Sequence, residues 1–388
     1  MTTATTRTIR TTPHPPDGET TARDSPRTPN TSLPSLTGLR WMAALLVFGL
    51  HVNNFGYFGD TGGSLVYWAF SSGATGVSFF FVLSGFVLTW SARPHDRALG
   101  FWRRRIARIY PVHLVTVGLA FLLALTLENN AQPTPKQAVA NVLLLHSWWR
   151  PWWQTLNPVS WSLACEVFFY ASFPLLILLL RRLGVRGSVA LGGLSLAAIV
   201  VVSRADSEHW WTYALSSFPA ARLPEFILGA VTARLVLLGR WRGPGLEASL
   251  ALAIIGYFMV PQAPLGYSAT MCTIIGFTLL IPAAANADLK GLPSMWRGRR
   301  MVRLGELSFA FYMVHLLVLR AATHLLGIKP HFDGLAAMAV TAAVFALSLG
   351  LSWLLYELVE LPARRLLLRR RHPAKAPAPH EAQAAARD

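Results

Sequence analysis

Long apolar runs recur along this chain, and their length constrains its fold more than any other feature. A helix needs about 20 predominantly apolar residues to cross roughly 30 Å of hydrocarbon. Because a backbone in lipid must satisfy its own hydrogen bonds, runs of this length span as helices. They occur near residues 38–57, 73–92, 108–127, 162–180, 188–203, 214–238, 247–262, 267–286, 304–326 and 334–361. The sequence therefore predicts an all-α fold, a polytopic membrane helix bundle of about ten transmembrane helices.

The basic residues support this helix count independently. The net charge is +17, although only 14% of the residues are charged, and Lys and Arg collect in short clusters between the apolar runs. This pattern marks the cytoplasmic loops of membrane proteins, so we exclude nucleic acid as a partner. If the helices alternate from an N-terminus inside, all but 6 of the 35 Lys and Arg lie on the cytoplasmic side. We expect a multi-pass protein of the cell membrane, with the lipid bilayer as a partner and both termini cytoplasmic.

Composition divides the chain into three parts. Residues 1–33 are rich in Thr, Pro and Arg and poor in large apolar side chains, so we expect a disordered cytoplasmic tail there. Residues 34–368 hold all the apolar runs and form the predicted transmembrane domain. Residues 369–388 are expected to be a second disordered tail, which is basic and contains Pro and Ala.

Ionisable residues inside apolar spans are expensive and are therefore the candidates for chemistry. Arg40 and His51 lie eleven residues apart in the first run, about 16 Å along one face of a helix. Glu166 enters the fourth predicted span from the opposite surface, to a depth similar to that of His51. A carboxylate that orients an imidazole creates a general base, so we predict a dyad of His51 and Glu166. A structural hydrogen bond between helices is the alternative.

Other embedded polar residues indicate structure more than catalysis. Arg222 and Glu225 are three residues apart and are expected to pair, while His315 and Glu360 are interpreted as structural. A metal site is rejected, because the histidines lack a ligand spacing of the His-Glu-x-x-His type. The two cysteines give neither a disulfide framework nor a metal cage.

Two further segments each allow two interpretations. Arg104, Arg105 and Arg108 lie at the cytoplasmic start of the third predicted span, where guanidinium groups suit the phosphates of coenzyme A. Basic residues also occur at such helix ends for topological reasons alone. The loop near 128–161 carries five tryptophans, which indicate either an interfacial anchor or a stacking platform at the entry for an acceptor.

Taken together, these residues resemble the acyltransferase 3 family of integral membrane O-acyltransferases. The resemblance spans about 36–362 and rests on the order and spacing of five segments. These are the helix from Arg40 to His51, Phe80–Phe86, Arg105–Pro111, Trp161–Tyr170 and Leu304–His315.

The resemblance implies a ten-helix domain that transfers an acyl group from acyl-CoA to a sugar or another alcohol. The family's essential pair corresponds to Arg40 and His51, its donor-binding arginines to Arg105 and Arg108, and its carboxylate to Glu166. Many members that act on surface polysaccharides carry an acid where this chain has Ser78. Residues 35–41 and 77–90 look most like actinobacterial members that acylate macrolides or other polyketide antibiotics.

The expected reaction is therefore transfer from acetyl-CoA or another short acyl-CoA to a hydroxyl-bearing small molecule or glycan, without a metal. His51, oriented by Glu166, takes the proton of the acceptor hydroxyl, and Arg40 helps to bind the donor. The sequence allows direct attack and an acyl-histidine intermediate alike. A transporter or flippase is the rival class, in which buried Arg, His and Glu form a transport path.

Overall fold

The computed structural model describes residues 32–93, 96–127, 132–205, 217–263 and 269–368. Within these ranges the regular secondary structure is helical, apart from one isolated bridge between Phe58 and Phe332. The disordered tails predicted for 1–33 and 369–388 fall almost entirely outside the described residues.

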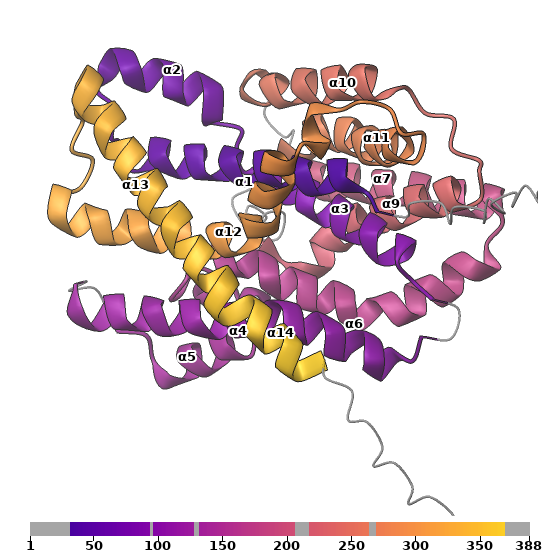
Figure 1. Ribbon diagram of the computed structural model, residues 1–388, viewed down its shortest axis with the longest axis horizontal. Coiled ribbons are helices and arrows are strands. Elements are labelled where there is room, and N and C mark those ends of the chain that lie inside the picture. Colours follow the sequence, from indigo (N-terminus) through magenta and orange to yellow (C-terminus); the bar gives the residue numbers. More distant parts are fainter. Residues whose placement is uncertain (1–31, 94–95, 128–131, 206–216, 264–268, 369–388) are drawn as a thin grey trace, which may run out of the picture. The chain divides into compact units, whose positions relative to one another are not determined.

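The predicted all-α polytopic bundle is confirmed, since each of the ten apolar runs contains a helix (Figure 1). Within the described residues, eight segments are long and apolar enough to cross a membrane. Each segment contains one of eight helices: α1 (Pro34–Asn54), α3 (Thr75–Trp90), α4 (Ala98–Thr126), α6 (Trp161–Arg182), α7 (Val185–Ala205), α11 (Ala269–Leu289), α12 (Arg299–Leu326) and α13 (Gly334–Leu355). The span that ends with α3 begins within α2 (Asp60–Phe70), and the last span continues through α14 (Leu361–Leu368).

Two helices in the predicted runs are too charged or too short to count among these eight segments. They are α9 (Pro219–Leu237), which carries Arg222, Glu225 and Arg234, and α10 (Leu246–Met259), which has 14 residues. A short 3-10 turn, Val260–Gln262, extends α10. Embedded charge on α9 and the short length of α10 therefore explain why these two runs differ from the other eight.

Small residues let two pairs of helices approach at backbone distance. A Cβ added at Gly85 of α3 would lie 1.9 Å from the carbonyl oxygen of Phe226 on α9. The reciprocal contact is as close, because a Cβ at Gly229 would lie 1.8 Å from the carbonyl oxygen of Val82. Likewise, Gly305 of α12 faces the carbonyl oxygen of Thr37 on α1. Such small residues are typical of helix interfaces in membranes, where close van der Waals packing drives association.

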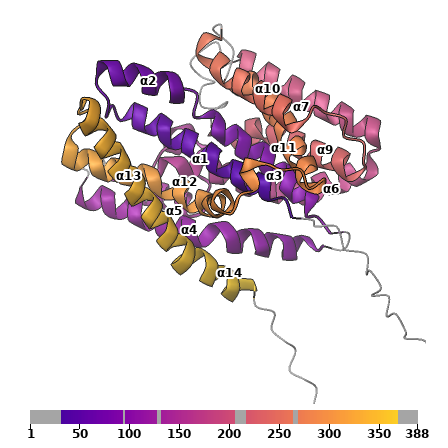
Figure 2. The same ribbon diagram turned by 45° about the horizontal axis from the view of Figure 1, so that its top comes forward.

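Helices α1 and α12 pack against each other in the interior of the bundle. Their interface is aromatic: Trp41 and Phe48 of α1 both contact Phe311 of α12, with ring centroids 5.1 and 5.6 Å apart. Helix α13 packs against α12, and α14 packs against α4. Figure 2 shows α13 running into α14 as one continuous yellow path, joined by the π-helical turn Tyr356–Glu360. This arrangement leaves the facing surfaces of α1, α3, α4, α6 and α12 to enclose the site.

Candidate active site

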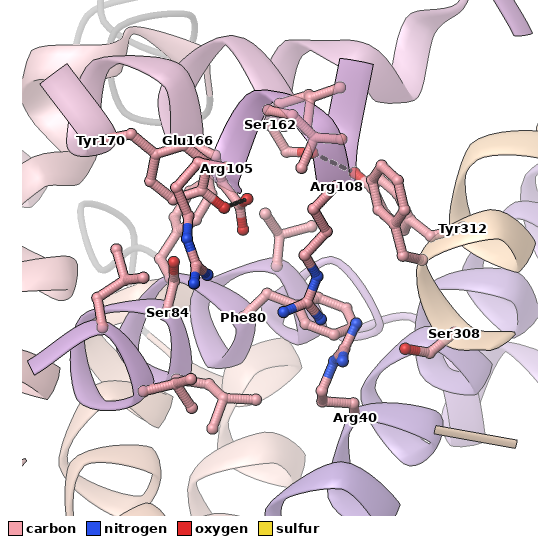
Figure 3. A pocket seen from close by; sticks show the side chains of 18 of the residues that line it. Arg40, Phe80, Ser84, Arg105, Arg108, Ser162, Glu166, Tyr170, Ser308 and Tyr312 are labelled. Atoms are coloured by element: carbon pink, nitrogen blue, oxygen red, sulfur yellow. Dashed lines mark hydrogen bonds between the residues drawn. The ribbon is translucent and has the colours of Figure 1, made fainter. Parts of the chain in front are cut away.

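A cavity of about 110 Å³ lies where five helices meet, and Figure 3 shows the side chains around it. Arg40 reaches it from α1, Arg105 and Arg108 from α4, and Glu166 from α6. Arg40 and Glu166 come from otherwise apolar runs, whereas Arg105 and Arg108 come from the basic start of α4. The helices thereby bring three guanidinium groups and one carboxylate to a single small space. A cavity with this excess of positive charge suits an anionic ligand.

Local contacts hold the carboxylate and the α4 arginines in place. The hydroxyl of Tyr170, one turn after Glu166 on α6, donates a hydrogen bond to the Glu166 carboxylate (Figure 3). The indole of Trp102 on α4 donates to the carbonyl of Tyr170 at 2.9 Å, which ties α4 to α6. The guanidinium of Arg105 also lies over the ring of Phe101, 5.7 Å from its centroid. The spacing of Glu166 and Tyr170, i and i+4, is a sequence signal for this contact.

Hydroxyl groups form another part of the cavity wall. The hydroxyls of Ser162 on α6 and Tyr312 on α12 are 2.9 Å apart, and both lie 3.1 Å from the carbonyl oxygen of Val159. Ser308 also lines the cavity, one turn before Tyr312 on α12. Sequence reasoning did not identify these hydroxyls, because Ser and Tyr in apolar helices occur commonly without a functional role. Only the packing of α6 against α12 brings them together.

A second cavity, of about 420 Å³, adjoins the first. Both are lined by Leu88 and Arg105, so the two spaces meet at this arginine. The second cavity is also lined by Arg93, Arg104 and Arg181. The predicted donor-binding arginines are thus divided: Arg108 faces the first cavity, Arg104 the second, and Arg105 both. Arg104 forms an ion pair there with Asp96, and Arg181 donates to the carbonyl of Arg93 at 2.8 Å.

The predicted dyad of His51 and Glu166 is wrong. Nδ1 of His51 lies instead 2.9 Å from Nε2 of His315 on α12. Glu166 lines the cavity beside Arg40, and Arg40 lies about 16 Å along α1 from His51. The prediction inferred a contact from similar depth, but depth does not fix how two helices are rotated about their axes. The carboxylate faces the arginines, which compensate its charge.

His315, interpreted from the sequence as structural, is thus the partner of the candidate base. It lies in α12, fully buried, while His51 on α1 is partly exposed. Along both helices the cavity residues come first, Arg40 in α1 and Tyr312 in α12, and the histidines follow. The two histidines therefore lie beyond the cavity in the direction in which α1 and α12 run.

The predicted pair of Arg222 and Glu225 is confirmed, with Nη1 and Oε1 2.9 Å apart and both residues buried. Arg222 also donates to the hydroxyls of Ser78 at 3.0 Å and Thr270 at 2.8 Å. The resemblance led us to expect an acid at position 78 in many polysaccharide-modifying members. In this chain Ser78 accepts a hydrogen bond from Arg222, and Glu225 supplies the carboxylate.

The family follows from sequence comparison. A family model described as an acyltransferase domain, that of acyltransferase 3, matches residues 33–357. The chain belongs to the acyltransferase 3 family. This acyltransferase is similar to Acyltransferase MdmB of Streptomyces mycarofaciens, with 39% identity over 89% of this chain and 95% of that protein. It also resembles the O-acetyltransferase OatA of Staphylococcus aureus (strain NCTC 8325 / PS 47), with 25% identity over 86% of this chain and 57% of OatA. No solved structure matches this acyltransferase.

These findings give the protein its class. The family match covers most of the chain, and the described residues contain eight helices suited to crossing a membrane. The protein is therefore a multi-pass membrane acyltransferase.

Proposed function

We propose that this acyltransferase moves an acetyl or other short acyl group from acyl-CoA to a hydroxyl of a macrolide or related polyketide. The observation that carries the proposal is the junction at Arg105 of two arginine-lined cavities, a small one and a larger one. Acyl-CoA has a matching form, since a narrow arm bears the thioester and a bulky nucleotide bears the phosphates.

The dimensions and charges of the two cavities support acyl-CoA as the donor. The larger cavity is within the range typical of small-molecule sites, and guanidinium groups pair well with phosphates. The smaller cavity has room only for the narrow acyl-bearing arm. In this proposal Arg104 and Arg105 bind phosphate, while Arg108 and Arg40 lie beside the arm. The charge pattern predicts cytoplasmic termini, and in that orientation Arg93, Arg104 and Arg181 of the larger cavity lie on the cytoplasmic side, where acyl-CoA is available.

His51 is the proposed general base. It takes the proton of the acceptor hydroxyl while the hydroxyl oxygen attacks the thioester carbonyl. The bond between the carbonyl carbon and sulfur breaks. The sulfur takes the proton that His51 accepted, and CoA leaves as the free thiol. Arg40, which lines the smaller cavity, helps to bind the donor there. An acyl-histidine intermediate divides the same reaction into two transfers.

A macrolide or polyketide acceptor is supported by the segments 35–41 and 77–90 and by a relative from Streptomyces. The alternative acceptor is a cell-surface glycan, which the more distant similarity to OatA brings into consideration. Ser78 favours the first, because many polysaccharide-modifying members carry an acid at this position. A transporter is the remaining alternative, and the family match argues against it.

A panel of acceptors tests the function directly. Purified protein in lipid nanodiscs is incubated with labelled acetyl-CoA and, separately, with macrolides, other polyketides that bear hydroxyls, and simple glycans. Nanodiscs without the protein are the control. Formation of a labelled macrolide or polyketide ester supports the proposal. Label on a glycan alone would establish the alternative acceptor, and no transfer by folded protein would contradict the acyltransfer proposed here.

A further inference from the structure

The contact between His51 and His315 determines which nitrogen of His51 is available for chemistry. Nδ1 of His51 and Nε2 of His315 are 2.9 Å apart, although 264 positions separate the two residues in the sequence. A neutral imidazole has one N–H donor and one lone pair. The nitrogen that donates in this contact therefore fixes the tautomer of both rings, and the surroundings of His315 identify it.

His315 donates from its other nitrogen into its own helix. Its Nδ1 lies 2.8 Å from the carbonyl oxygen of Tyr312 and 3.1 Å from that of Phe311. Carbonyl oxygens only accept hydrogen bonds, so Nδ1 of His315 carries the hydrogen. The ring is fully buried and stacks on Phe311, with centroids 5.8 Å apart. A second proton would place an unpaired charge in this apolar environment, which is costly, so Nε2 carries the lone pair.

The tautomer of His51 follows from that of His315. Since Nε2 of His315 accepts, Nδ1 of His51 must donate and therefore carries the hydrogen. The lone pair of His51 is then on Nε2, the nitrogen that points away from His315. The ring of His51 is partly exposed, whereas that of His315 is buried. Of the two histidines, His51 is therefore the one that an acceptor can approach.

We propose that His315 is a positioning residue for acyl transfer, which holds His51 in the Nδ1–H tautomer so that Nε2 serves as the base. The proposal rests on the function proposed above and specifies how its base is prepared. The acceptor O–H bond breaks, its proton moves to Nε2, and the oxygen forms the new bond to the acyl carbon. The carbon–sulfur bond breaks, and the sulfur takes the proton from Nε2, which restores the neutral ring.

The arrangement differs from the predicted carboxylate dyad in one respect. A neutral histidine orients the base as a carboxylate does, but it adds no negative charge beside the imidazolium that forms. Tautomer and orientation alone are nevertheless valuable, because a base that presents N–H to its substrate cannot accept a proton. Replacing His315 should therefore lower kcat and leave donor binding nearly unchanged.

Two substitutions at this position separate positioning from packing. In His315→Gln, the side-chain oxygen can occupy the place of Nε2 and accept from His51, whereas His315→Leu removes the acceptor. We expect the Leu variant to lose about 100-fold or more in kcat, with the KM for acetyl-CoA changed less than about twofold. The Gln variant should retain at least about tenfold more activity than the Leu variant. Equal activity of the two variants would overturn the role of His315.

Nitrogen NMR of the substrate-free protein provides a second test that needs no activity. With ¹⁵N-labelled histidine in nanodiscs, the signals that disappear in His51→Gln identify the ring of His51. These signals should show Nδ1–H in the wild type and an increased share of Nε2–H in folded His315→Leu, where the carbonyl of Val47 is the remaining acceptor near the ring of His51. An Nε2–H tautomer of His51 in the wild type would overturn the proposal. If the wild type shows the Nδ1–H tautomer but transfers no acyl group, the tautomer assignment is supported and the proposed function is contradicted.

Discussion

Tyr170 donates a hydrogen bond to the carboxylate of Glu166, one helical turn earlier on α6. The carboxylate is thereby held among Arg40, Arg105 and Arg108 instead of beside His51. The charged residues and the proposed base therefore lie at different positions along the bundle. The charged groups gather at the cavity, and the proposed base lies farther along α1 with its own partner.

Removal of the Tyr170 hydroxyl should lower the stability of the folded protein. Hydrogen bonds to charged groups contribute about 1.5–3 kcal/mol, so we expect Tyr170→Phe to lower the free energy of unfolding by about that amount. Tyr110→Phe is the matched control, because that hydroxyl donates to the neutral carbonyl of Val142 at 2.9 Å and should cost about 1 kcal/mol. Unfolding in detergent compares the two variants. Equal losses would contradict a charged partner for Tyr170.

The larger cavity should recognise the nucleotide end of the donor. Loss of a charge-assisted contact of about 1.5–3 kcal/mol weakens binding by about 10- to 100-fold. We therefore expect Arg105→Ala and Arg181→Ala to raise the KM for acetyl-CoA by at least about tenfold. With Arg181→Ala the KM for acetyl-pantetheine, which lacks the nucleotide, should stay unchanged. Arg182→Ala is the control, since Arg182 does not line either cavity. An equal rise for both donors in Arg181→Ala would refute the nucleotide assignment.

The contact of α3 with α9 should not tolerate even one added methyl group. Gly85→Ala and Gly229→Ala each place a Cβ within 2 Å of a carbonyl oxygen, so the helices must move apart. We expect each to destabilise the protein by about 3 kcal/mol or more. Gly118→Ala on α4 is the control, because nothing lies within 4 Å of its Cβ. That change should be neutral or stabilise by about 0.5–1 kcal/mol. Thermal unfolding in detergent measures the difference, and similar effects at the three positions would contradict the packing described.

The buried pair of Arg222 and Glu225 should be sensitive to loss of one partner. Glu225→Ala leaves a buried guanidinium without its carboxylate, so we expect a cost of about 3–5 kcal/mol. Glu306→Ala, which removes an exposed partner of Arg303, should cost less than about 1 kcal/mol. The double substitution Arg222→Met with Glu225→Leu should recover much of the lost stability, because no charge remains buried. Unfolding midpoints that are equal for the two single variants would refute the difference.

The helices were predictable from the sequence, whereas their contacts were not. Apolar length and clustered charge located the ten runs, because spanning a bilayer imposes both features. Spacing within one helix also sufficed for Arg222 and Glu225, which are three residues apart. By contrast, His51 and His315 belong to helices distant in sequence, and their contact depends on how α1 and α12 are rotated. The same limitation placed Glu166 beside the wrong residue.

Replacement of His51 tests its proposed role as the base in acyl transfer from acyl-CoA. The most direct test follows labelled ester and released CoA for purified wild type and His51→Ala in nanodiscs, with a macrolide acceptor. We expect equal amounts of ester and CoA from the wild type. The variant should react at least about 100-fold more slowly, with acetyl-CoA still bound. Ester formation at the wild-type rate by folded His51→Ala would exclude His51 as the base.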